Sequence, residues 1–131
     1  MVMRRLLATG LAGALAGACA SPSVAPETPV ATPMPTGLEG AVLAARADAA
    51  RRTGVAAESL LLLSAESVTW SDGSLGCPQP GMMYTQALVP GYRVRLRGPG
   101  GEMDYHASAR GALVLCPAER AVDPLPGASR I

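Results

Sequence analysis

Two cysteines outside the N-terminal segment could form a covalent cross-link. Cys77 and Cys116 are each followed by proline, and no C-x-x-C or H-x-x-x-H pattern accompanies them. In an exported chain, two such cysteines most simply form a disulfide. A metal site built from His106 and one or both cysteines would lack the usual ligand spacing. We therefore expect a Cys77–Cys116 disulfide and no metal or other cofactor.

His106 is the only histidine of the chain and its main candidate for acid–base chemistry. A hydrolytic site would place it near Asp72 or Asp104 and beside an activated serine, but the sequence contains no nucleophile-elbow motif. Asp104 and His106 lie two residues apart, which is ordinary for a strand with one face in solvent. We expect no catalytic residue, and a small hydrolase is the least favoured of three functions that the sequence permits.

Three arginines alternate with apolar residues, at Arg93, Arg95 and Arg97. On a strand they would share one face and could bind lipid headgroups, cell-wall polymer or an acidic peptide. If the chain turns at residues 98–101, each arginine gains a polar neighbour on the next strand. The expected pairs are Arg97 with Glu102, Arg95 with Asp104, and Arg93 with His106. A solvated, charge-paired face is therefore favoured over an anion-binding site.

The segment after Trp70 is rich in turn formers and aromatic residues. Residues 71–90 contain several glycines and prolines and cannot form one regular element. One interpretation is an omega-like loop clamped by Trp70 and the disulfide, with Met82 and Met83 packed on the core rather than binding copper. The other is a rigid loop presented for recognition. Its candidate contact residues are Trp70, Asp72, Met82, Met83, Tyr84 and Gln86.

The elements that would position these residues form one small α+β domain. Residues 38–53 have helical periodicity and precede Gly54, a typical C-cap. A strand is expected over residues 60–70, although its alternation does not identify the buried face. Three shorter strands are expected over residues 92–97, 102–106 and 112–116. The predicted fold is one N-terminal helix packed on an antiparallel sheet of about four strands, with one disulfide.

The N-terminal residues 1–19 have the features of an export signal. Arg4 and Arg5 precede a short apolar stretch and small residues, and the segment ends at Cys19. Its end resembles the lipobox of bacterial lipoproteins, which implies lipidation of Cys19 and attachment to the membrane. Simple cleavage and secretion, an uncleaved anchor, and twin-arginine export remain alternatives. We expect a lipid-anchored protein of the cell envelope, or otherwise a periplasmic or secreted one.

Composition separates the rest of the chain into three parts. Residues 20–37 are proline-rich and predict a disordered tether, residues 38–117 the single domain, and residues 118–131 a flexible tail. The 131-residue chain has 11 basic residues, all arginine, and 10 acidic residues. Such a balance excludes the basic surface of a nucleic-acid-binding protein. Loss of the two signal arginines leaves 9 basic against 10 acidic residues, a net charge of −1.

A longer motif carries a resemblance to known proteins. Residues 70–92 read W-x-D-G-x-L-G-C-P-x-P-G-x-x-Y-x-Q-x-x-x-P-G-Y, and a Tyr-His pair and a final L-C-P follow. This pattern resembles an uncharacterised family of small bacterial secreted proteins and lipoproteins, over about residues 42–117. The resemblance implies export and a one-domain α+β fold, and it implies no activity. In this chain Tyr105-His106 is followed by Ala107-Ser108, where the family pattern has Thr-Asp.

A weaker likeness concerns bacterial lipoprotein inhibitors of serine proteases with a potato-inhibitor-type fold. Their Pro-Gly before a strand and their final cysteine-containing strand have parallels in residues 87–91 and at Leu115-Cys116. The sequence thus predicts a non-enzymatic binding or structural module of the envelope, with an envelope protein or peptide as partner and no nucleic acid. The alternative is a protease inhibitor whose reactive loop is residues 78–90.

Overall fold

The computed structural model describes residues 10, 13–14, 17–26 and 35–127. Most of the predicted signal segment and residues 27–34 of the predicted tether lie outside these residues. The chain divides into two units, Met1–Ala31 and Thr32–Ile131, and the domain belongs to the second. Among the described residues, none of the helical structure is long and apolar enough to span a bilayer.

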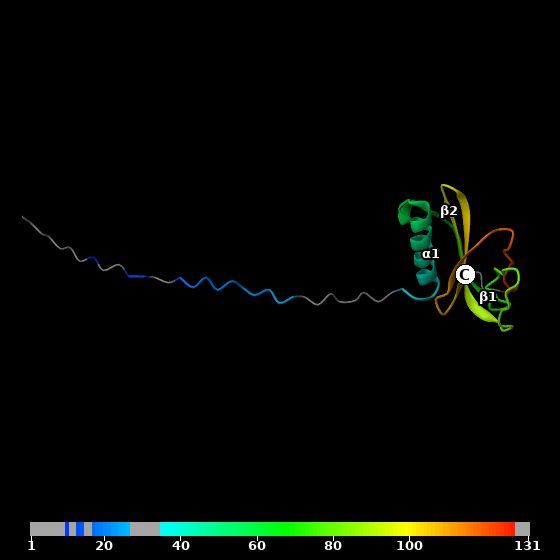
Figure 1. Cartoon of the computed structure of the whole chain (residues 1–131), viewed down its shortest axis with the longest axis horizontal. Coiled ribbons are helices and arrows are strands. Elements are labelled where there is room, and N and C mark those ends of the chain that lie inside the picture. Colours follow the sequence, from blue (N-terminus) through cyan, green and yellow to red (C-terminus); the bar gives the residue numbers. More distant parts are fainter. Residues whose placement is uncertain (1–9, 11–12, 15–16, 27–34, 128–131) are drawn as a thin grey trace, which may run out of the picture. The chain divides into compact units, whose positions relative to one another are not determined.

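The described part of the domain contains one α-helix, one short 3₁₀ helix and four strands. In chain order they are α1 (Gly37–Thr53), η1 (Ala57–Ser59), β1 (Leu61–Trp70), β2 (Val89–Gly98), β3 (Gly101–Ser108) and β4 (Leu113–Cys116). The strands form one antiparallel sheet in the order β1-β2-β3-β4. Helix α1 lies on one face, and the β1–β2 loop and the C-terminal segment lie on the other (Figure 1). The predicted α+β fold is confirmed.

Helix α1 ends where the sequence predicts. Gly54 adopts a left-handed conformation with φ 74°, and its N–H donates to the carbonyl of Ala50. Glycine adopts this conformation without the steric cost that a Cβ would add. Arg51 and Arg52 in the last turn form ion pairs with Asp48. These contacts stabilise the C-terminal end of the helix.

The first hydrophobic core lies between α1 and the sheet. Its buried members are Ala45, Ala49, Leu60, Val94, Leu96 and Tyr105. The helix contributes only alanines to this buried set, which lets its backbone approach the sheet closely. Tyr105 is fully buried, and its hydroxyl donates to Asp48 Oδ2 at 2.9 Å. The helix is therefore tied to β3 by a polar contact at the edge of the core.

A second, smaller core lies on the opposite face of the sheet. It consists of Val68, Trp70 and Leu75, with Val89 and Val114 packed against it. The alternation of β1 was ambiguous in the sequence because each face is covered only in part: Ala65 packs against the first core, Val68 and Trp70 belong to the second, and Glu66 and Ser67 between them are exposed. A bulge between Leu62 and Ser64 also shifts the register of β1 against β2. This bulge interrupts the two-residue alternation of side chains between the two faces of β1.

The Trp70 side chain crosses the neighbouring strand at Gly91. Its Nε1 donates to the carbonyl of Ala107 on β3 at 3.0 Å. A Cβ on Gly91 would lie 2.0 Å from that carbonyl oxygen and 2.9 Å from Nε1. A Cβ on Gly76 would lie 2.6 Å from the indole ring. Both positions therefore require glycine because the tryptophan and the adjacent backbone fill the space.

The C-terminal segment is ordered further than we predicted. The flexible tail was expected to begin at residue 118, but the backbone N–H groups of Val122 and Leu125 donate to the carbonyls of Gly76 and Thr69. Asp123 also forms an ion pair with Arg93 at 2.9 Å. Residues 118–127 thus cover the end of β1 and the loop after it, a long-range contact that local composition does not encode.

The close approach at Gly91 gives a test of this packing. Gly91→Ala should lower the free energy of unfolding by about 2–4 kcal/mol, because the new methyl group displaces either the indole or the β3 backbone. Gly100→Ala is the control, since a Cβ there meets nothing within 4 Å. It should change stability by less than about 0.5 kcal/mol. Urea unfolding followed by the fluorescence of the single tryptophan measures both; equal effects would contradict the packing.

Candidate functional site

Trp70 and His106 form a stacked pair at the centre of the second core. Their ring centroids are 4.4 Å apart with an interplanar angle of 21°, and both residues are fully buried. The prediction that His106 lies on a solvent-facing strand was wrong. The loop after β1 and the disulfide cover the end of the sheet face on which His106 lies. This face is therefore polar only towards the opposite end of the strands.

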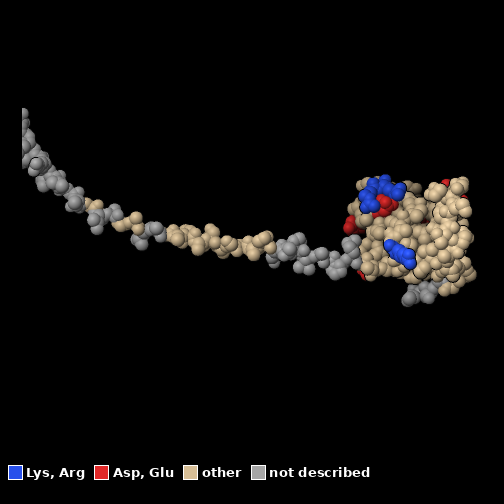
Figure 2. Space-filling view, turned by 60° about the horizontal axis from the view of Figure 1, so that its bottom comes forward, with Lys and Arg blue, Asp and Glu red and all other residues tan. Residues whose placement is uncertain are grey.

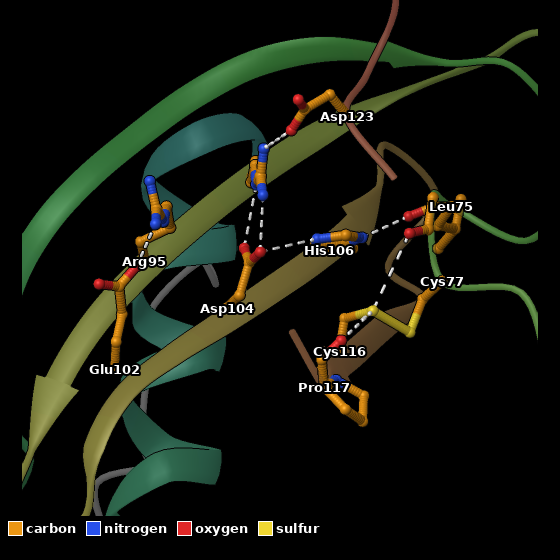
Figure 3. Close-up of polar contacts among 11 residues, drawn as sticks. Leu75, Cys77, Arg95, Glu102, Asp104, His106, Cys116, Pro117 and Asp123 are labelled. Carbon is orange, nitrogen blue, oxygen red and sulfur yellow. Dashed lines mark hydrogen bonds and ion pairs between the residues drawn. A yellow bond between two sulfur atoms is a disulfide. The ribbon is translucent and has the colours of Figure 1, made fainter. Parts of the chain in front are cut away.

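Both ring nitrogens of His106 face oxygen atoms (Figure 3). Nδ1 lies 2.6 Å from the carbonyl oxygen of Leu75. A carbonyl oxygen can only accept, so Nδ1 carries the proton of this hydrogen bond. Nε2 lies 3.3 Å from Asp104 Oδ2, at ion-pair distance but without the alignment of a hydrogen bond. His106 thus connects the loop at Leu75 to a carboxylate on its own strand.

Asp104 is the centre of a charged network beside the stacked rings. Arg93 binds it through Nε and Nη2 at 3.0 and 2.7 Å, and the same guanidinium reaches Asp123 at 2.9 Å. The side chains of Arg93 and Asp104 are only 15% and 14% exposed. This bidentate, mostly buried pair is stronger than an exposed surface ion pair.

The strand register was predicted correctly, but the charge pairs were not. Arg97, Arg95 and Arg93 do lie opposite Glu102, Asp104 and His106. The ion pairs run diagonally instead: Arg93 binds Asp104, and Arg95 binds Glu102. Long arginine side chains reach diagonal neighbours across a sheet, and His106 is stacked under Trp70. Three arginines on one face therefore do not form an anion-binding stripe.

The environment of Asp104 changes its acidity. Burial alone would raise the pKa of this carboxyl group, but contacts with His106 and Arg93 outweigh burial and hold the pKa well below its usual range. Asp104 is therefore ionised in the folded protein at all ordinary pH values. Together with the inaccessible His106, this indicates a network that holds the loop in place.

The disulfide was predicted correctly. Cys77 and Cys116 are bonded, with their Cα atoms 5.7 Å apart, and both residues are buried. The bond joins the loop after β1 to the end of β4 (Figure 3). Cys19 is exposed and forms no disulfide. Among the described residues, no group of three or more His, Cys, Asp or Glu side chains is placed to hold a metal ion.

The loop between β1 and β2 is held by its own hydrogen bonds. Asp72 Oδ1 accepts from the N–H of Ser74 at 2.8 Å, which turns the chain directly after β1. The N–H of Gly73 donates to the carbonyl of Thr85 at 2.9 Å and joins the two ends of the loop. The Tyr84 hydroxyl accepts from the N–H of Gln79 at 2.9 Å. The loop is therefore structured without helix or strand.

The predicted contact residues divide into two groups. Trp70 is buried, so it supports the loop and offers no surface to a partner. Tyr84 and Asp72 are half-buried and engaged within the loop, whereas Gln86 is exposed. Met82 and Met83 are 59% and 95% exposed, so the expectation that they pack on the core was wrong.

Sequence reasoning missed Leu88, which is 64% exposed near the end of the same loop. The signal for it was the absence of charge: no Asp, Glu, Lys or Arg occurs from Gly73 to Tyr92. A cavity of about 420 Å³ lies beside this part of the loop, lined by Thr85, Ala87, Leu88, Val89, Pro90 and Arg110 among others. We call residues 78–88 the presented loop.

One comparison with known proteins gives a match. The family model described as a domain of unknown function (DUF8738) matches residues 42–116, from the first half of α1 to the end of β4. The matched segment contains the stacked rings, the Arg93–Asp104 pair, the disulfide and the presented loop, whereas Asp123 lies beyond it. Neither the curated proteins nor the solved structures yield a significant match.

The low pKa of Asp104 predicts that the free energy of unfolding decreases at acid pH. A carboxyl group whose pKa is lower in the folded state adds stability above its unfolded pKa of about 4, and this stability is lost as the pH falls further. Asp104→Asn should cost about 2–4 kcal/mol at pH 7 and reduce the loss of stability below pH 4. Urea unfolding at pH 7, 4 and 3 measures the difference.

Glu102→Gln is the matched control for that substitution. It removes the partner of Arg95 in an exposed pair, so it should cost less than about 1 kcal/mol at pH 7. If both variants lose stability in parallel with the wild type on acidification, Asp104 is not the group responsible for the loss of stability at acid pH.

Proposed function

The chain belongs to the family described as a domain of unknown function (DUF8738), and we propose that its domain is a non-enzymatic binding module. The module presents residues 78–88 to a protein or peptide partner at the cell envelope. One observation carries the proposal: large apolar side chains are exposed on a loop that is otherwise firmly held. Met82, Met83 and Leu88 are 59%, 95% and 64% exposed.

The exposed side chains are costly unless a partner covers them. Methionine and leucine gain free energy when they leave water, at about 25 cal/mol per Å² of apolar surface. Methionine is also an adaptable contact residue because its unbranched side chain fits irregular surfaces. The uncharged stretch from Gly73 to Tyr92 removes the desolvation cost that charges at the centre of an interface would add.

The anchoring of the loop supports binding in a second way. Hydrogen bonds at Gly73 and Tyr84, the disulfide at Cys77, and the bond from His106 to Leu75 restrict the loop before any partner arrives. A loop that is already ordered loses less conformational entropy on binding. The buried network therefore supports a recognition surface and contacts no ligand itself.

We also propose that the protein is exported and anchored through a lipid on Cys19, as in the bacterial secreted lipoproteins that its motif resembles. Cys19 is exposed and outside the disulfide, so its thiol is available for acylation. The proline-rich segment that follows would separate the domain from the membrane surface. Membrane attachment would then restrict the partner to the envelope.

Replacement of Cys19 tests the anchor. Cys19→Ala should move the protein from the membrane fraction to the soluble or secreted fraction and abolish incorporation of labelled palmitate. Ser23→Ala, a change of similar size in the same segment, should leave both unchanged. Palmitate labelling and fractionation of the expressing bacterium give the result. Incorporation of palmitate into Cys19→Ala at the wild-type level would contradict lipidation of Cys19.

A second function is favoured by the position of Met83. Met83 is almost fully exposed, and the flanking Tyr84 and Thr85 are hydrogen-bonded within the domain. An exposed apolar side chain on a restrained loop is the arrangement that a protease inhibitor offers to an apolar substrate pocket. In that case residues 78–90 would be the reactive loop and the partner would be a protease.

A photo-crosslinking residue in place of Met83 tests the proposed surface. In the full-length protein it should yield a discrete adduct with an envelope protein, and Leu88→Ser in the same chain should reduce the yield about tenfold. Leu43, on α1 and 48% exposed, is the matched control position and should yield no such adduct. The same adduct from both positions, or none from either, would contradict the proposal.

An inhibition assay with the full-length protein distinguishes a protease inhibitor from a general binding module. Inhibition of a serine or cysteine protease at low concentration, lost in Met83→Glu and with the loop uncleaved, would identify the partner as a protease. Absence of inhibition across such a panel would exclude the inhibitor and leave the binding module.

A further inference from the structure

A second cavity lies between the start of α1 and the turn that joins β3 to β4, and it shares Ser108, Ala109 and Arg110 with the cavity beside the presented loop. It has a volume of about 300 Å³. Its walls include Gly37, Ala41, Ala44, Tyr92, Arg110 and Leu113. Cavities that bind small molecules commonly have volumes of about 300–1,000 Å³. This cavity is at the lower end of that range and suits a small ligand.

The cavity exists because small residues line it where the chain enters the helix. The helix contributes only glycine and alanine to its wall. A Cβ on Gly40 would lie 2.2 Å from the carbonyl oxygen of Pro35, so glycine lets the preceding chain fold back on the first turn. The backbone at Pro35 then forms one wall and the sheet another. Larger residues on this helix face would fill the space.

The polar groups of the cavity are few and have one sign of charge. Arg110 is the one charged residue among those that line it. Within the part of the chain that the structure describes, Arg110 forms no ion pair. The Tyr92 hydroxyl lies near Gly37 and makes no hydrogen bond among the described residues. A guanidinium and a phenol are thus both free to donate.

Arg110 differs from the other arginines by its place at the cavity, since Arg97 and Arg120 also form no ion pair among the described residues but do not line it. Arg93 and Arg95 bind carboxylates, and Arg46 donates to the carbonyls of Ala57 and Leu60. The face drawn in Figure 2 is largely uncharged, with one isolated basic patch apart from the cluster of acidic and basic atoms near one corner of the domain. An unpaired cation over an apolar cavity favours a ligand with the opposite charge.

We propose that this cavity binds a small organic acid that has an apolar body and a single carboxylate. The body lies against the alanines of α1 and Leu113, and the carboxylate accepts from the guanidinium of Arg110 and the hydroxyl of Tyr92. The side chain of Arg110 extends from the exposed turn of residues 109–112, so it can close over the carboxylate. Arg110 also lines the cavity beside the presented loop, whereas Ala44 lines only the cavity under α1.

Octanoate is the probe, with octanol and octylammonium as ligands of similar length that lack the negative charge. Calorimetric titration and protein-detected NMR of the whole chain without its lipid measure binding. Octanoate should bind at least about tenfold more tightly than octanol, the ratio expected for one charge-assisted hydrogen bond. Octylammonium should not bind. NMR shifts should include Tyr92 and residues 109–113.

Two pairs of variants locate the site. Ala44→Leu fills the cavity from an exposed helix position that favours leucine, and Ala47→Leu makes the same change outside it. Arg110→Gln removes the cation, and Arg97→Gln removes an exposed arginine elsewhere. Ala44→Leu and Arg110→Gln should each weaken octanoate binding about tenfold or more. The two controls should bind octanoate as the wild type does.

Three outcomes would overturn the proposal. The first is octanol binding as tightly as octanoate. The second is equal octanoate affinity in Ala44→Leu and Ala47→Leu, and the third is unchanged octanoate affinity in Arg110→Gln. Thermal unfolding of each variant verifies that the fold is intact. Because Ala44 lies outside the cavity beside the presented loop, crosslinking through Met83 in Ala44→Leu tests the proposed loop interaction separately.

Discussion

The placement of one tryptophan determines much of this domain. The Trp70 ring starts on β1, crosses β2 at Gly91 and donates to Ala107 on β3, so that a single side chain spans three strands. It stacks on His106 and lies against Gly76 of the loop. The chain has one tryptophan, three tyrosines and no phenylalanine, so few other residues could fill this space. A large aromatic side chain buries more apolar surface than any alternative, and the glycines make room for it.

The charged network beside the tryptophan positions the histidine at a cost. Burying Arg93 and Asp104 removes their hydration, and their bidentate contact offsets that loss without a large gain in stability. What the pair does supply is orientation: Asp104 faces one nitrogen of His106, which leaves the other for Leu75. Leu75 has a φ of 57°, an unfavourable left-handed conformation for leucine. The hydrogen bond to its carbonyl therefore helps to hold the loop in a shape that its local sequence disfavours.

The parts of the structure that follow from local pattern were predictable, and those that depend on distant contacts were not. Periodicity and turn residues predicted the helix, its end at Gly54, the meander and the β2–β3 register. The burial of His106 was missed because the loop that covers it precedes β3 by many residues and has no periodicity. The order of residues 118–127 was missed because their hydrogen bonds go to Thr69 and Gly76. The exposure of Met82 and Met83 was missed because apolar residues were assumed to be buried.

Residues 70–92 contain both the scaffold of the loop and its exposed surface. Trp70, the two glycines that its ring requires, and the bridged Cys77 form the buried scaffold. Met82, Met83 and Leu88 are exposed and take no part in that packing. A substitution at one of these three positions changes the surface of the loop without disturbing the scaffold, because those side chains touch solvent. The packing around Trp70 and the chemistry of the exposed surface can therefore vary independently.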